Sequence, residues 1–115
     1  MDDKIISTLD YAKRTVNLKK STFEEHICDG HPEMADNCHA IKEAVETPEV
    51  VYESNQSPKR EVFFSRVKSS SYPRLYTKVV VEYNNPYEGT IKSSWFEKSI
   101  TGVMKEGIKY VGKNK

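Results

Sequence analysis

The second half of the chain is a succession of strand-like segments separated by polar turns. Residues 49–55, 60–66, 74–83 and 88–98 are rich in Val, Ile, Tyr, Phe and Trp, which favour strands. The connections between them contain Asn, Ser, Pro and Gly, the residues that favour turns. Short connections of this kind join antiparallel neighbours. We therefore expect four consecutive strands that form an antiparallel meander.

A first helix is predicted to begin just after Ser21 and to end at Gly30. Ser21 is followed three residues later by Glu24, which is the pattern of a capping box, and glycine is a typical helix end. Within this helix Phe23 and Ile27 lie four residues apart and therefore share a face. We expect that face to point into the core.

A second helix is predicted from Ala35 or Asp36 to Pro48, which ends it. Its apolar residues recur at spacings of three and four, the period of a buried helical stripe. This stripe consists of Met34, Cys38, Ile41 and Val45. Helices followed by a run of strands are typical of an α+β domain. The expected architecture is therefore N-terminal helices packed on one face of a four-stranded antiparallel β-sheet.

The 115 residues are enough for one domain. We assign residues 14–102 to this domain, with a short strand at 14–20 ahead of the first helix. Residues 1–13 form an N-terminal extension whose apolar residues lie near helical spacing. Residues 103–115 form a basic C-terminal tail, for which weak structure or a short helix is expected.

The composition indicates a cytoplasmic protein. Hydrophobic residues make up 37% and charged residues 30% of the chain, as in soluble globular proteins. No apolar run approaches the roughly 18 residues of a membrane helix, and the acidic start does not resemble a secretory signal. The net charge of +1 gives no general case for nucleic acid. Between Lys59 and Lys78, however, basic residues outnumber Glu61, which fits either a solvated hairpin or a patch that contacts phosphate.

All the histidines and cysteines lie in "HICDGHPEMADNCH", residues 26–39. Cys28 and His31 have the spacing of one pair of zinc ligands. Cys38 and His39 are adjacent, so on a helix their side chains diverge by about 100° and cannot easily share an ion. A structural zinc site is therefore disfavoured, and a Cys28–Cys38 disulfide is disfavoured by the reducing compartment. No metal or other cofactor is expected.

His26 and His31 fit an acid–base pair. His26 lies at the edge of the buried face of the first helix, and His31 follows the helix end, two residues before Glu33. Histidine suits proton transfer because its reference pKa lies near neutrality. The alternative is that both imidazoles simply pack against the fold or cap a helix.

Three pieces of the chain together resemble one known domain. They read "TFEEHICDGHPEM", "IKEAVETPEVVYESNQSPKREVFF" and "YTKVVVEYNNPYEGTIKSSWF". In this order they are similar to the phage-associated nuclease-like domain of the barnase–EndoU–colicin–RelE superfamily, the BECR fold. The chain departs from that pattern at "KSSWF", where relatives usually have threonine and a small residue beside an aromatic one.

The resemblance implies a metal-independent endoribonuclease in which the ribose 2′-hydroxyl attacks its own phosphate. That chemistry needs a base, an acid and cations near the phosphorane. The residues that match the pattern are His26 and His31 as acid and base in either order, Lys78 as the cation, Arg60 as the phosphate ligand, and Ser93 or Ser94 as the hydroxyl donor.

Three aromatic residues are candidates for substrate binding. Tyr76 and Trp95 could stack on bases, although aromatic residues at such positions are often half-buried parts of a sheet. Tyr52 could donate to the site or could be a core tyrosine with a bonded hydroxyl. Lys78 could equally lie on the solvent face of the sheet.

The sequence therefore predicts an endoribonuclease, with a toxin or a phage-derived effector as its biological role. The expected partners are RNA and a cognate inhibitor protein, and no membrane is expected. The alternative is a catalytically inactive module of the same fold that binds RNA or a protein.

Overall fold

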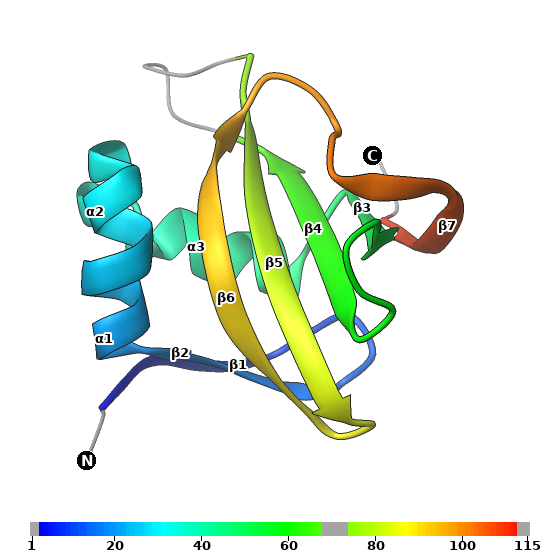
Figure 1. Ribbon diagram of the computed structural model, residues 1–115, viewed down its shortest axis with the longest axis horizontal. Helices are drawn as coiled ribbons and strands as arrows, with labels where there is room; N and C mark the ends of the chain where they lie inside the picture. Colours follow the sequence, from blue (N-terminus) through cyan, green and yellow to red (C-terminus); the bar gives the residue numbers. More distant parts are fainter. Residues whose placement is uncertain (1–2, 68–73, 113–115) are drawn as a thin grey trace.

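The strands of the chain form one seven-stranded mixed sheet (Figure 1). The computed structural model describes residues 3–67 and 74–112. The strands are β1 (Lys4–Leu9), β2 (Thr15–Lys19), β3 (Val50–Ser54), β4 (Arg60–Arg66), β5 (Tyr76–Asn85), β6 (Glu88–Glu97) and β7 (Val103–Val111). Their order across the sheet is β1-β2-β6-β5-β4-β3-β7. All neighbours are antiparallel except β2 and β6, which run parallel.

The predicted meander is confirmed, because β3, β4, β5 and β6 pair consecutively and antiparallel. The predicted strand at 14–20 is confirmed as β2. The expectation of a four-stranded antiparallel sheet is wrong, since the sheet is mixed and has seven strands. The three additional strands are β2 and one strand each from the N-terminal extension and the C-terminal tail. Residues 1–13 contain strand β1 rather than a helix, and residues 103–115 contain strand β7 rather than weak structure or a short helix.

Both corrections have the same physical reason. A short segment with few apolar residues fits helical and strand spacing almost equally well, so its surroundings decide its conformation. Strand β1 forms a hairpin with β2, and β7 pairs with the free edge of β3. In each case a partner strand supplies hydrogen bonds that the segment cannot make alone.

The chain between β2 and β3 is helical but only partly α-helical. It comprises α1 (Lys20–Thr22), a π-helical turn η1 (Phe23–Ile27), α2 (Cys28–Gly30), a 3₁₀ segment η2 (Pro32–Asp36) and α3 (Cys38–Glu46). The predicted first helix ends at Gly30 as expected, but its centre is a π-helical turn, and the second helix begins at Cys38 rather than at Ala35 or Asp36. The first helix begins at Lys20, with Lys19 as the N-cap, so Ser21 lies inside the first turn and the predicted capping box is wrong.

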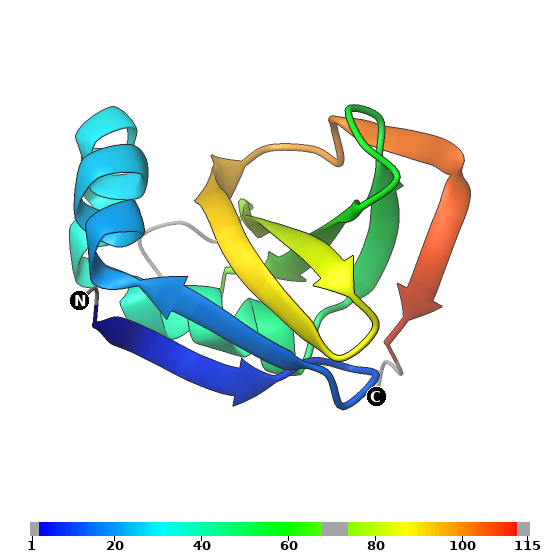
Figure 2. The same cartoon turned by 60° about the horizontal axis from the view of Figure 1, so that its bottom comes forward.

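The main core lies between these helices and one face of the sheet (Figure 2). Ile27 is fully buried and Phe23 packs against it at the edge of the cluster, as predicted. The predicted stripe of the second helix also faces the core, with Cys38 at its margin. On the opposite face of the sheet lies a smaller buried apolar cluster, which consists of Val62, Phe64 and Val80. Partly buried apolar side chains pack against this cluster. Among the described residues, no helix is long and apolar enough to cross a membrane.

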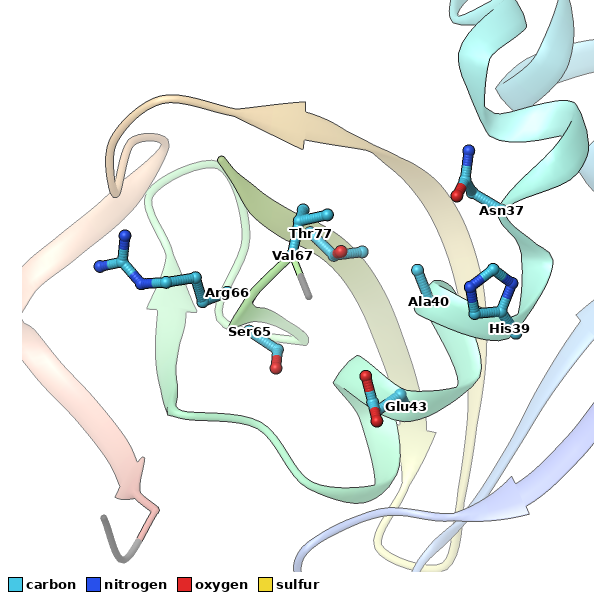
Figure 3. A pocket seen from close by; sticks show the side chains of 8 residues that line it. All are labelled: Asn37, His39, Ala40, Glu43, Ser65, Arg66, Val67 and Thr77. Atoms are coloured by element: carbon cyan, nitrogen blue, oxygen red, sulfur yellow. The ribbon is translucent and has the colours of Figure 1, made fainter. Parts of the chain in front are cut away.

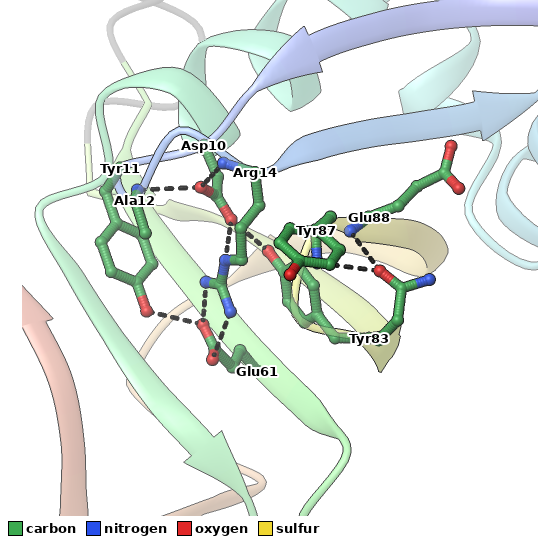
Figure 4. Close-up of polar contacts among 9 residues, drawn as sticks. Asp10, Tyr11, Ala12, Arg14, Glu61, Tyr83, Tyr87 and Glu88 are labelled. Atoms are coloured by element: carbon green, nitrogen blue, oxygen red, sulfur yellow. Dashed lines mark hydrogen bonds and ion pairs between the residues drawn. The ribbon is translucent and has the colours of Figure 1, made fainter.

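A polar network joins the β1–β2 turn to the centre of the sheet (Figure 4). Arg14 donates from Nε to Asp10 at 2.8 Å and from Nη1 and Nη2 to the two oxygens of Glu61 at 3.1 and 2.8 Å. The hydroxyl of Tyr83 donates to Asp10 at 2.6 Å, and that of Tyr11 donates to Glu61 at 2.7 Å. The Arg14 guanidinium also lies 3.8 Å from the centre of the Tyr83 ring. The turn is therefore held by a satisfied ionic cluster rather than by apolar packing alone.

Candidate active site

The alternation of β5 places Lys78 on the sheet face that α3 does not cover. Val79 and Val81 point into the main core, so Lys78 and Val80 point to the other side. Lys78 lies opposite Phe64 on β4 and opposite Trp95 on β6. The centre of this face is thus a lysine flanked by aromatic rings.

A β-bulge in β6 turns two adjacent polar residues toward the same face. Ile91 and Ser94 are both fully buried, and the register of β6 against β5 shifts between Ile91 and Ser93. The extra residue in a bulge breaks the strict alternation of a strand. As a result, Lys92 and Ser93 both line the surface on the Lys78 side.

The helical segment that follows β2 runs beside the second half of β6. Strand β2 pairs with β6 only over Thr15–Asn17, after which the chain turns into α1 (Figure 1). His26 lies in η1 and His31 directly follows α2, while Ser93 and Trp95 lie two residues apart on β6. His26 lines the hollow at Ser93, and His31 stacks on the ring of Trp95.

Two adjoining hollows form one groove at this place. The narrower, of about 80 Å³, is lined by residues that include Lys78, Trp95, Ser54 and Gly102. The wider, of about 290 Å³, is lined by Thr22, His26, Arg60, Lys92 and Ser93. Arg60 and Ser93 line both hollows, so the two are neighbours. We call this surface the β6 groove.

Lys78 is held tightly within the β6 groove and is only 5% exposed. Its Nζ lies 4.6 Å from the centre of the Trp95 ring and donates to Oγ1 of Thr101 at 3.4 Å. The backbone of Gly102, with φ +73°, approaches so closely that a Cβ there would lie 2.9 Å from Nζ. Burial lowers the pKa of Lys78, and the nearby charge of Glu97 partly opposes this effect. The ammonium is therefore a desolvated cation in a fixed place.

His31 is held against the indole ring of Trp95. The two rings are stacked, with their centres 5.1 Å apart and their planes 17° apart. Trp95 is in turn oriented by Glu97, which accepts its Nε1–H at 2.9 Å. The carboxylate of Glu33 lies 3.9 Å from Nδ1 of His31. The second ring nitrogen, Nε2, is therefore not the one that faces Glu33.

Arg60 and Lys92 share one carboxylate. Nε of Arg60 lies 3.0 Å from Oε1 of Glu82, and Nζ of Lys92 lies 4.0 Å from Oε2 of the same residue. The hydrogen bond from Arg60 lowers the pKa of Glu82, so this carboxylate is ionised at neutral pH. Two cations facing one anion leave this end of the groove with a positive charge.

The structure brings most of the predicted site residues together. Those that line the β6 groove are His26, Arg60, Lys78, Ser93 and Trp95, and His31 does not line it but stacks on Trp95. Ser94 does not belong to it, because its hydroxyl is fully buried on the core side and donates to the backbone oxygen of Lys78 at 2.8 Å. Of the two serines that the sequence left open, only Ser93 reaches the groove.

Tyr52 and Tyr76 do not line the groove. Tyr52 packs edge-on against Phe64, with ring centres 6.5 Å apart. Tyr76 also meets Phe64 edge-on, and its hydroxyl accepts a hydrogen bond from Arg66 at 3.0 Å. Both tyrosines are half-buried parts of the sheet. Of the predicted basic patch, Arg60 and Lys78 line the groove, Arg66 contacts Tyr76, and Lys68 lies outside the described residues.

Lys92, Glu82 and Glu97 were missed by the sequence reasoning. Lys92 depends on the bulge, for which the sequence carries no local signal. Glu82 and Glu97 look like ordinary charges near strand ends, and their roles become visible only through their partners on neighbouring strands and loops.

The remaining candidate ligands lie elsewhere. Cys28 and Cys38 are both free thiols, and burial raises the pKa of each. Among the described residues, no three His, Cys, Asp or Glu side chains are grouped so that they could hold a metal ion. His39 is exposed on α3 and lines a separate cavity of about 200 Å³ with Ser65 and Thr77 at the end of β4 and β5 (Figure 3).

Comparison with known proteins gives no relative: no family model, no curated protein and no solved structure matches this chain.

Proposed function

We propose that the chain is an endoribonuclease that cleaves RNA in the β6 groove without a metal ion. The observation that carries the proposal is that His26 and Lys78 line two hollows that share Arg60 and Ser93, while His31 and Lys78 both contact the Trp95 ring. Two imidazoles beside fixed cations are the groups that transesterification of RNA requires. The resemblance of the sequence motifs to BECR-type nuclease domains suggests the same chemistry, although the sheet is not the four-stranded antiparallel one expected with that resemblance.

The proposed reaction needs no water in its first step. The ribose 2′-oxygen attacks the adjacent phosphorus, a new O2′–P bond forms, and the P–O5′ bond breaks. The products are a 2′,3′-cyclic phosphate and a free 5′-hydroxyl. One imidazole accepts the proton of the 2′-hydroxyl, and the other, as imidazolium, donates a proton to the leaving 5′-oxygen.

The other groups of the groove stabilise the phosphorane. The Lys78 ammonium and the Arg60 guanidinium balance its negative charge, and the Ser93 hydroxyl donates to a non-bridging oxygen. Lys78 suits this role because its position is already fixed by Trp95 and by the loop at Gly102, so little reorganisation is needed.

A non-catalytic RNA-binding module is the second candidate. The observation that favours it is the stack of His31 on Trp95, because a flat pair of rings beside basic residues is also a platform for unpaired bases. Cleavage distinguishes the two functions directly.

The test uses single-stranded RNA of mixed sequence, incubated with the full chain in excess EDTA. We expect fragments with 2′,3′-cyclic phosphate ends. His26→Ala and His31→Ala should each slow cleavage by about 10²–10⁴-fold. His39→Ala is the matched control, since this exposed histidine lies on α3 and should leave the rate unchanged.

A second control lies in the substrate. Once a cleavage site is mapped, replacing its 2′-hydroxyl by hydrogen should abolish cleavage at that position, because the attacking oxygen is gone. Intact RNA in every mixture, or equal cleavage by the wild type and both histidine variants, would overturn the proposal. Binding of RNA without cleavage would establish the second candidate instead.

A further inference from the structure

The β-bulge at Lys92 lies directly beside the candidate catalytic groups. In an unbroken strand, Lys92 and Ser93 would point to opposite faces. The register shift turns both toward the β6 groove, at the cost of a regular ladder. Bulges often re-aim side chains next to active sites, and this one adds a cation to the wider hollow of the groove.

The surroundings of Lys92 fit a phosphate group better than a base. The wider hollow is lined mainly by polar side chains, with Thr22 and His26 on one wall and Arg60 and Lys92 on the other. The aromatic surface of the groove, by contrast, lies at its opposite end, where Trp95 and His31 stack. The groove therefore has a cationic end at Arg60 and Lys92 and an aromatic end at Trp95, which also holds the buried Lys78, and Ser93 lines both hollows.

The charges at the cationic end are only partly balanced. Glu82 lies 3.0 Å from Arg60 but 4.0 Å from Lys92, so Lys92 is the more loosely held of the two cations. The Lys92 side chain is 42% exposed, which lets its ammonium reach a ligand that enters from solvent.

We propose that Lys92, with Thr22 on the facing wall of the same hollow, binds the phosphate next to the scissile one, so that the enzyme acts on RNA strands with a charged linkage on that side. The inference rests on the proposed ribonuclease function and adds a second phosphate subsite to it. Lys92 is a binding residue here, and the acid–base chemistry stays with the histidines. Lys92 places the strand so that the scissile phosphate lies over Ser93.

The test uses a short RNA with one mapped cleavage site and a single uncharged methylphosphonate linkage placed immediately before or immediately after it. For the wild type, KM should rise about tenfold at one of the two positions and stay unchanged at the other. For Lys92→Gln, KM for unmodified RNA should already be about tenfold higher, and the methylphosphonate should add nothing. Lys92→Arg should retain the preference, and Lys42→Gln, on α3, is the matched control.

The salt dependence provides a second readout. The slope of log KM against log salt concentration should decrease by about 0.7 for Lys92→Gln, the value for one phosphate contact of a single strand. The subsite is refuted if neither methylphosphonate affects the wild type, or if Lys92→Gln suffers the same further loss as the wild type. Those outcomes leave cleavage itself intact, whereas failure of the ribonuclease proposal would appear as no cleavage of any of these RNAs.

Discussion

Replacement of Arg14 by methionine should destabilise the fold by about 4 kcal/mol. The guanidinium makes three charge-assisted hydrogen bonds, to Asp10 and Glu61, at 2.8 to 3.1 Å. The side chain of Asp10 is fully buried, and those of Arg14 and Glu61 are 17% and 12% exposed. Removing one partner of a buried ion pair costs about 3–5 kcal/mol, because the other charges are left buried without compensation.

The remaining contacts keep the loss within that range. Methionine preserves the apolar stem beside the Tyr83 ring. Asp10 still accepts hydrogen bonds from two backbone N–H groups and from Tyr83, and Glu61 still accepts one from Tyr11. The loss should therefore fall below the sum of the three bonds, which would be as much as about 9 kcal/mol.

Urea unfolding followed by the emission of Trp95, the only tryptophan, measures this loss. For a domain of this size the expected change corresponds to a fall of about 15 °C in Tm. Arg14→Lys, which keeps the charge but loses the planar fork, should cost about half as much.

The control is Lys42→Met. Lys42 pairs with Glu46 at 3.8 Å, but their side chains are 54% and 39% exposed, so its loss should cost less than about 0.5 kcal/mol. The reasoning is refuted if Arg14→Met costs less than about 1 kcal/mol, or no more than Lys42→Met. Either result would mean that the two carboxylates do not need their cation.

Three further predictions concern the groove. Ser94→Ala should lower the free energy of unfolding by about 1 kcal/mol and leave the cleavage rate unchanged. Ser93→Ala should slow cleavage and leave the stability unchanged. Urea titration measures the stability of each variant, and single-turnover kinetics measure its cleavage rate. Emission of Trp95 should change in His31→Gln, because the imidazole ring is stacked on the indole, and unchanged emission would contradict the stack. The lowered pKa of Lys78 means that its proton is lost at a lower pH than for an ordinary lysine, so the alkaline limb of the rate profile should move upward in Lys78→Arg, and an unmoved limb would contradict this role.

The central strands could be predicted because their signals are local. The segments 49–55, 60–66, 74–83 and 88–98 are rich in strand-favouring residues and are separated by turn residues, and they contain β3, β4, β5 and β6. The edge strands carry no such signal. In β7, Met104, Ile108 and Val111 are all exposed, so no amphipathic period marks the segment as a strand. Its conformation follows from pairing with β3, a long-range contact that the sequence of the segment does not encode.

The candidate site was predictable by residue type but not by side-chain direction. Histidines near a helix end and a lysine in a strand can be recognised from the sequence. Which of Ser93 and Ser94 faces the groove depends on one bulge, because a shift of a single residue reverses the face of every following side chain. Because of the same bulge, a prediction that assumes regular alternation places the Lys92 side chain on the wrong face of the sheet.

Alternation also separates the stabilising network from the groove although the two are adjacent in sequence. On β4, Glu61 faces the Arg14 cluster while Arg60 faces the groove, and on β5 Tyr83 and Glu82 divide in the same way. The cluster on one face is closed and fully bonded, and the charges on the other are partly open to solvent. Arg14→Met should therefore lower stability without lowering kcat/KM at temperatures well below its Tm. A sheet that holds its strands in place from one face can keep unbalanced cations on the other, where a phosphate can bind them.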